Sequence, residues 1–181
     1  GERHVKEARI LEFPHADETS TYHIGMLHGS MDGDSSHAVY APFRKEQLLS
    51  KNYDYWALGH IHLRQILHSD PCIVYPGNIQ GRHRKETGPK GFYDVCMSNG
   101  ETSLQFIRTS AVCFETLEVS CKEMMHMNEL IDACTAVAER YINENNAVMA
   151  VLHLKDVDEY AGELLEGIPE EALLEAIQES L

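Results

Sequence analysis

Two short apolar segments, each followed at once by a histidine and a glycine, constrain the fold of this chain more than any other feature. The first covers residues 22–27 and leads into His28-Gly29, and the second covers 53–58 and leads into Gly59-His60-Ile61-His62. Short apolar runs bounded by polar turns predict buried strands, and the intervening residues predict a helix over 43–51. This alternation predicts an α/β fold. Ligands in such folds bind at the strand ends, where we expect these histidines.

The second of these turns, Gly59 to His62, places two imidazoles two residues apart. In an extended segment, side chains at that spacing project toward the same side. Paired neutral imidazoles bind Zn²⁺, Mn²⁺, Fe²⁺ or Ni²⁺, and the neighbouring glycine leaves room for an ion or a phosphate. The pattern therefore indicates metal ligands at His28, His60 and His62. The alternative is a set of strand-end histidines that hydrogen-bond to the backbone.

The rest of the chain predicts two β-hairpins, then a strand–helix–strand unit and two C-terminal helices. The second hairpin has the stronger signal, because Asn99-Gly100 favours a tight turn between strands. We expect Cys72 and Cys96, on the hairpin strands, to be buried as small apolar residues. The predicted elements span 64–68 with 72–75, 91–97 with 102–108, 114–120, 128–143, 147–154, 159–165 and 169 onward.

A change of pattern near residue 111 predicts a domain boundary, with one domain over 1–110 and a second over 111–181. The charges change at about the same place. The chain has a net charge of −14, and 16 of its 29 acidic residues but 3 of its 15 basic residues lie beyond residue 114. Because phosphate affinity comes mainly from Lys and Arg, the net charge opposes non-specific DNA binding, and the acidic second region opposes it most.

The five cysteines are scattered and form no Cys-x-x-Cys pair. This usage predicts reduced thiols in a cytoplasmic protein rather than a disulfide framework or a zinc ribbon. The apolar runs are far shorter than the roughly 18–20 residues that span a bilayer, and no signal peptide opens the chain. We therefore expect no membrane association.

Three groups of residues together resemble the C-terminal half of a calcineurin-like metallophosphoesterase. They are His28-Gly29, residues 55–62 and residues 75–78. The likeness is strongest to the SbcD-like DNA repair exonuclease branch. Residues 27–30, 40–43 and 75–83 are similar to the YhaO-type bacterial proteins of that branch.

The resemblance implies a particular α/β architecture and a metal-dependent chemistry. The fold would be a partial metallophosphoesterase β-sandwich flanked by helices, followed by the start of an α+β capping domain. The activity would be that of a two-metal phosphodiesterase, usually with Mn²⁺ and with Zn²⁺, Fe²⁺ or Ni²⁺ as possible substitutes. By motif position, His28 and His60 would bind one ion and His62 the other.

The resemblance also implies contacts to substrate. Asn78, in the turn after residue 75, would shape the floor beside the metal site. Arg82 and His83 would meet a phosphate backbone. For the neighbouring basic residues Arg84 and Lys85, a solvated loop is the alternative to a nucleic-acid contact.

The chain also departs from the family pattern. The motifs Asp-x-His, Gly-Asp-x-x-Asp and Gly-Asn-His are absent, so the bridging carboxylate and the catalytic residues are expected N-terminal to this chain. Three imidazoles alone should hold at most one divalent ion, and weakly. We therefore expect a C-terminal fragment that is inactive by itself.

Together these features predict a metal-dependent DNA exonuclease or phosphodiesterase of DNA repair. DNA and an SbcC-like ATPase subunit are the expected partners, and a homodimer is possible. Two alternatives stay open at this point. One is a phosphodiesterase or phosphatase of the same fold that acts on small molecules, and the other is a non-catalytic binding or scaffold module with a degenerate metallophosphoesterase fold.

Overall fold

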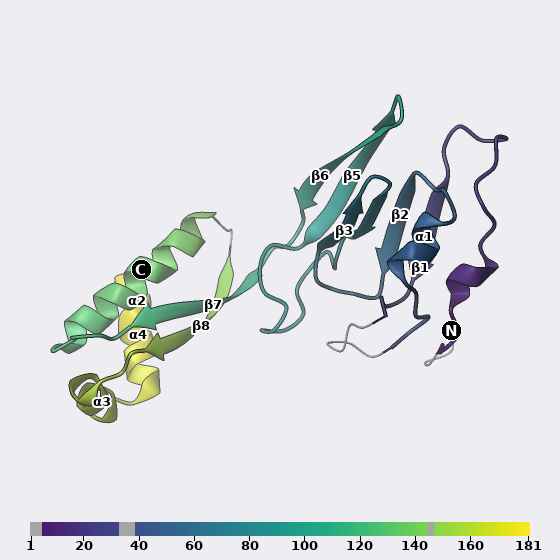
Figure 1. Cartoon of the computed structure of the whole chain (residues 1–181). Coiled ribbons are helices and arrows are strands. Elements are labelled where there is room, and N and C mark those ends of the chain that lie inside the picture. Colours follow the sequence, from purple (N-terminus) through teal and green to yellow (C-terminus); the bar gives the residue numbers. More distant parts are fainter. Residues whose placement is uncertain (1–4, 33–38, 145–146) are drawn as a thin grey trace. The chain divides into compact units, whose positions relative to one another are not determined.

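The computed structural model describes residues 5–32, 39–144 and 147–181. They form a mixed α/β fold, as the sequence predicts (Figure 1). The chain divides into two compact units. Unit 1 comprises residues 1–80 and 89–110, and unit 2 comprises 81–88 and 111–181. The assignment of 1–110 to a catalytic domain and of 111–181 to a capping domain stays a prediction.

Unit 1 is built on a four-stranded sheet in the order β1-β2-β4-β3. The first three of these run parallel and β3 runs antiparallel to β4. Strands β5 and β6 form a separate antiparallel hairpin. The elements of unit 1 are a 3-10 helix at Arg9–Glu12, β1 (Ile24–His28), α1 (Lys45–Leu49), β2 (Tyr55–Gly59), β3 (Gln65–Ser69), β4 (Cys72–Tyr75), β5 (Gly91–Ser98) and β6 (Glu101–Arg108).

Strands β2 and β4 of the main sheet of unit 1 are covered on both faces. On one face, Trp56 and Ile73 are fully buried in a core that includes Leu48 of α1. On the other face, Tyr55 and Val74 pack against side chains of the β5–β6 hairpin. Alternate residues of β2 and β4 therefore enter two different cores, which explains why these strands are apolar almost throughout.

Two sequence expectations for unit 1 are wrong. The first apolar segment is not a buried strand, because Ile24 and Met26 are 56% and 76% exposed. They lie on the same sheet face as Tyr55 and Ala57 of β2. The β5–β6 hairpin covers this face where it belongs to β2. Where the same face belongs to β1, no described residue buries it. Cys96 is exposed, because β5 alternates and turns its neighbours Val95 and Met97 inward.

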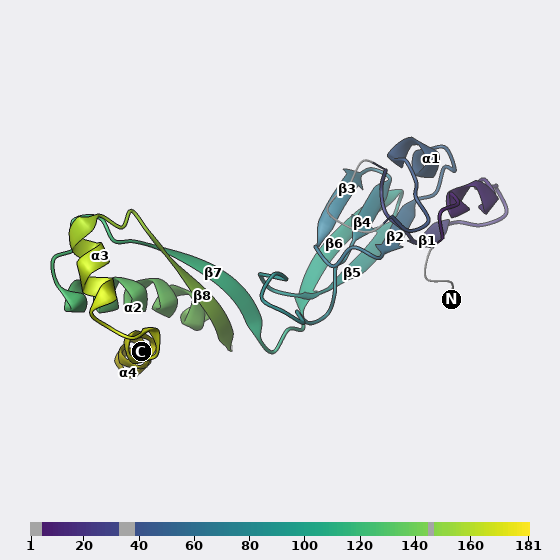
Figure 2. The same ribbon diagram turned by 90° about the horizontal axis from the view of Figure 1, so that it is seen from below.

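Unit 2 is a β-α-β unit followed by two helices (Figure 2). Strand β7 (Cys113–Ser120) pairs in parallel with β8 (Val148–Lys155), and α2 (Met127–Glu144) makes the crossover between them. Helix α2 packs on this sheet and against α4 (Glu170–Ser180).

The core of unit 2 lies between its sheet and its helices, with Val119, Leu130, Cys134 and Ile177 buried in it. The Asp158 carboxylate caps α3 (Glu159–Glu166) by accepting a hydrogen bond of 2.9 Å from the Ala161 N–H. Within the described residues, no helix combines the length and the apolar character needed to cross a membrane.

We expect Gly25→Ala to destabilise unit 1. A Cβ atom at Gly25 would lie 2.2 Å from Cε3 of Trp56, which is fully buried and is the only tryptophan of the chain. The ring would have to shift in a packed core, so the free energy of unfolding should fall by about 1–3 kcal/mol. Urea unfolding followed by Trp56 fluorescence measures this change.

The matched control is Gly162→Ala in α3, where an added Cβ meets no atom within 4 Å. This variant should move the Trp56 transition by no more than about 0.5 kcal/mol. Equal effects of the two substitutions would contradict the packing described for Gly25.

Candidate metal centre

The parallel pairing of β1 and β2 brings two of the predicted metal ligands to one edge of the sheet. His28, the last residue of β1, is in register with Gly59, the last residue of β2, and His60 follows directly. The ring centroids of His28 and His60 are 5.3 Å apart, with their planes at 75°. Two of the three histidines expected at the site are therefore neighbours.

Glycines keep this edge open for the imidazoles. A Cβ atom at Gly59 would lie 2.9 Å from Nδ1 of His28, so any larger residue would displace that ring. Gly77 has a φ of +82°, and a Cβ there would lie 2.7 Å from the carbonyl oxygen of His62. The next residue, Asn78, donates its backbone N–H to the same oxygen over 3.3 Å. The turn after β4 thus supports the backbone of His62.

The backbone at His60 is strained. Its φ of +102° lies in the region that favours glycine, and a non-glycine residue there costs about 1–3 kcal/mol. Hydrogen bonds hold the turn around it, because the Gly29 N–H donates to the Gly59 carbonyl over 3.2 Å. The Tyr75 hydroxyl in turn donates to the Gly29 carbonyl over 2.6 Å. Strain that the surroundings maintain in this way is typical of functional sites.

Tyr40 completes the aromatic cluster, and the sequence gives no role for it. Its ring stacks on His60 at 5.6 Å and 24°, and it meets His28 edge-on at 5.4 Å and 86°. Three hydrogen bonds between Tyr40 and Ser30 hold the segment. The Ser30 N–H (2.8 Å) and the Ser30 hydroxyl (3.2 Å) donate to the Tyr40 carbonyl, and the Tyr40 N–H donates to the Ser30 hydroxyl (3.0 Å). Tyr40 belongs to no periodic pattern, and its place in the 40–43 segment of the family resemblance is the signal that could have drawn attention to it.

The electrostatics of the cluster favour a neutral His28. Partial burial of the ring lowers the pKa of His28 below its ordinary value, and the nearby His60 and His62 lower it further. The third predicted ligand is therefore close enough to affect the first. A neutral imidazole is the form that binds metal ions, so the shift suits a ligand.

The donor set fits only part of a divalent metal centre. Over the described ranges, no three or more His, Cys, Asp or Glu side chains come together in a group that could hold a metal ion. His28 and His60 offer two imidazole ligands, and no carboxylate of the described residues joins them. The roles of His28, His60 and His62 as metal ligands stay predictions.

The predicted substrate-binding residues are divided between the two units. Asn78 lies in unit 1, where its carbonyl also accepts the Gly91 N–H over 3.2 Å. Arg82 and His83 lie in the 81–88 loop, which belongs to unit 2. Both are exposed side chains, and their contact with a phosphate backbone stays a prediction.

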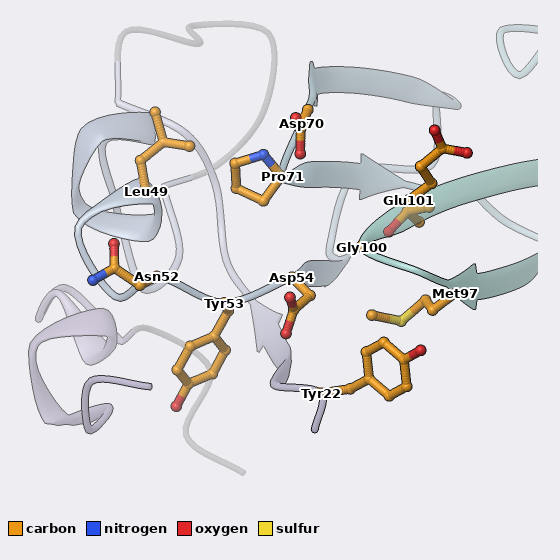
Figure 3. A pocket seen from close by; sticks show the side chains of 11 residues that line it. Tyr22, Leu49, Asn52, Tyr53, Asp54, Asp70, Pro71, Met97, Gly100 and Glu101 are labelled. Atoms are coloured by element: carbon orange, nitrogen blue, oxygen red, sulfur yellow. The ribbon is translucent and has the colours of Figure 1, made fainter. Parts of the chain in front are cut away.

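A separate cavity of about 190 Å³ occupies the other end of the main sheet in unit 1 (Figure 3). Asp54 and Pro71 line it, and they precede β2 and β4, so the cavity lies at the amino ends of these strands. Asp70 and Glu101 add two more carboxylates. Asp54 accepts the backbone N–H of His23 over 2.7 Å, so this carboxylate also supports the chain before β1. None of the predicted site residues lines this cavity.

The chain is similar to a bacterial metallophosphoesterase. It is 40% identical over 160 residues to the protein described as "Uncharacterized metallophosphoesterase YhaO" from Bacillus subtilis strain 168. The matched region covers 87% of this chain and 39% of that relative, so the chain spans well under half of the relative's length. No family model matches the chain. The similarity suggests the metallophosphoesterase family and agrees with the motifs around His28, His60 and Asn78.

The lowered pKa of His28 predicts a pH dependence that nuclear magnetic resonance can measure. In the metal-free protein, the His28 ring should titrate with a midpoint below 6.5, its ordinary value. Because the folded-state pKa is depressed, the unfolded chain binds the proton more readily. The favourable contribution of His28 to the free energy of unfolding should therefore be complete above about pH 6.5. It should be lost as the pH falls through the folded-state pKa.

His60→Ala removes one neighbouring charge and part of the burial of the His28 ring, so it should raise the titration midpoint of His28. His15→Ala is the control, because this exposed histidine is not among the groups that shift the pKa of His28. A midpoint at or above the ordinary value in the unsubstituted protein would contradict the described cluster.

Proposed function

We propose that this chain supplies the histidine side of a divalent metal centre in a metal-dependent phosphodiesterase that acts on DNA. The observation that carries the proposal is the convergence of His28 and His60 at the carboxyl ends of two parallel strands. The similarity to a metallophosphoesterase over 87% of the chain supports the same chemistry.

His28, His60 and His62 would hold the metal, with Mn²⁺ as the proposed ion and two ions in the intact site. A divalent ion bound there would polarise a phosphoryl oxygen and lower the pKa of a bound water. The chain's own residues would prepare the site. Tyr40 holds the His28 and His60 rings, and the Gly77-Asn78 turn holds the backbone of His62.

We further propose that the 181 residues do not hydrolyse phosphodiesters by themselves. The described residues bring no carboxylate to the histidines, and a two-ion site needs one to bridge the ions. For the whole protein we propose a DNA repair exonuclease that works with an SbcC-like ATPase. That assignment rests on the resemblance of the motifs.

The test compares two proteins, the 181-residue chain and the product of the complete gene that encodes it. Each is assayed with Mn²⁺ on single-stranded DNA and on bis(p-nitrophenyl) phosphate. We expect the complete product to degrade DNA and the 181-residue chain to be inactive. His60→Ala in the complete product should lower the rate by at least about 100-fold, because it removes a metal ligand. His15→Ala, an exposed histidine of the same unit, should leave the rate unchanged.

The alternatives give different results in the same assay. Activity of the complete product on bis(p-nitrophenyl) phosphate but not on DNA would indicate a phosphodiesterase of small molecules. No activity on either substrate, together with unchanged metal binding in His60→Ala, would indicate a non-catalytic module. Mn²⁺-dependent hydrolysis by the 181-residue chain would contradict the claim that it is inactive alone.

A further inference from the structure

A groove of about 500 Å³ lies on unit 2, and all the residues that line it belong to this unit. The histidine cluster belongs to unit 1. One wall is the 81–88 loop, and the other is the sheet face that points away from the buried core of unit 2. The residues that line it are Arg84, Lys85, Thr87, Thr116, Val151 and His153.

The register of the sheet explains the second wall. Thr116 of β7 pairs with Val151 of β8, and Glu118 pairs with His153. Neighbours of these residues, such as Val119, point the opposite way into the core. The groove therefore uses the sheet face that no helix of the described residues covers, and its shape depends on the regular geometry of two strands.

The loop that forms the first wall is held in place. The Gly88 N–H donates to the Phe114 carbonyl over 3.0 Å, and Thr87 makes an isolated bridge with the same residue. The Glu86 carboxylate, only 9% exposed, accepts the Arg82 N–H over 2.8 Å and lies 3.5 Å from Nε2 of His83. Because the backbone is already ordered, a ligand would not have to immobilise it.

The chemistry of the groove is that of an anion site. Two cationic side chains, an imidazole and two hydroxyls line it, and no carboxylate of the described ranges does. Neither Arg84 nor Lys85 forms an ion pair in the part of the chain that the structure describes. Glu118 is the acidic neighbour of His153, and it is already paired with Lys155 over 2.5 Å.

This arrangement contrasts with the rest of unit 2, which is strongly acidic. The three basic residues beyond residue 114 are Lys122, Arg140 and Lys155, and both lysines pair with glutamates. Unlike these two lysines, Arg84 and Lys85 are not neutralised by a carboxylate of the described residues. Carboxylates that lie farther away than the Debye length, about 8 Å at physiological salt, weaken these two charges little.

We propose that this groove binds the phosphate groups of a nucleic-acid strand, which deepens the proposed function and rests on it for the choice of a phosphodiester ligand. Arg84 would donate to phosphate oxygens through its planar guanidinium, and Lys85 would add a second charge. The hydroxyls of Thr87 and Thr116 donate hydrogen bonds without adding charge. The volume exceeds that of a single phosphate, and Val151 offers an apolar surface to a sugar or base.

The test is the binding of a fluorescent oligothymidylate of about 16 nucleotides by the 181-residue chain in EDTA, followed by anisotropy over a range of salt concentrations. Each phosphate contact to a single strand contributes about 0.7 to the slope of log K against log salt. The double variant Arg84→Ala/Lys85→Ala should therefore bind more weakly and reduce the magnitude of that slope by about 1.4. Circular dichroism establishes that the variant is folded.

Lys122→Ala is the matched control, because Lys122 is an exposed cation of the same unit outside the groove. It should leave the slope unchanged. The proposal is overturned if the unsubstituted chain does not bind, if the double variant keeps its slope, or if Lys122→Ala reduces it equally. It is also overturned if inorganic phosphate displaces the strand far better than sodium chloride of equal ionic strength, because the ligand would then be free phosphate.

The two proposals can fail separately. The binding assay contains EDTA, so it does not depend on the histidine site. The chain could bind the strand through Arg84 and Lys85 while its complete gene product hydrolyses no phosphodiester. That result would support the proposed groove and overturn the proposed activity. The opposite pair of results would sustain the activity and overturn the groove.

Discussion

The parallel pairing of β1 with β2 is the interaction on which the candidate site depends. Register places His28 opposite Gly59, and only a residue without a side chain leaves space for the His28 ring. A shift of one residue would turn His28 to the other face of the sheet. The strain at His60 persists because the hydrogen bonds around Gly29 hold the same pairing. The positions of His28 and His60 at this sheet edge thus follow from the pairing of β1 and β2 along their whole length.

The net charge of −14 is unevenly distributed over this protein. The acidic residues concentrate in the second region, while Arg84 and Lys85 line one groove together with residues of the β7–β8 sheet. Because exposed charges are screened over about 8 Å, local arrangement decides whether an anion can bind. An acidic chain can therefore carry a groove suited to phosphate.

Local patterns in the sequence predict most of the elements of this fold. Asn99-Gly100 locates the β5–β6 hairpin, and both residues have the positive φ that the tight turn requires. Long-range features escape prediction. The exposure of Met26 depends on which strands the hairpin covers, and Tyr40 reaches the histidines through tertiary contacts alone. The groove likewise joins Arg84 to His153, which no spacing in the sequence could connect.

The central claim is that His28, His60 and His62 form the histidine side of one metal centre. The most direct measurement is the loss of imidazole signals in the nuclear magnetic resonance spectrum of the protein on addition of substoichiometric Mn²⁺. The chain has eleven histidines, and paramagnetic broadening reports which of them lie beside the ion. We expect the signals of His28, His60 and His62 to broaden first and together. Uniform broadening of all eleven, or earlier loss of another histidine's signal, would contradict the claim.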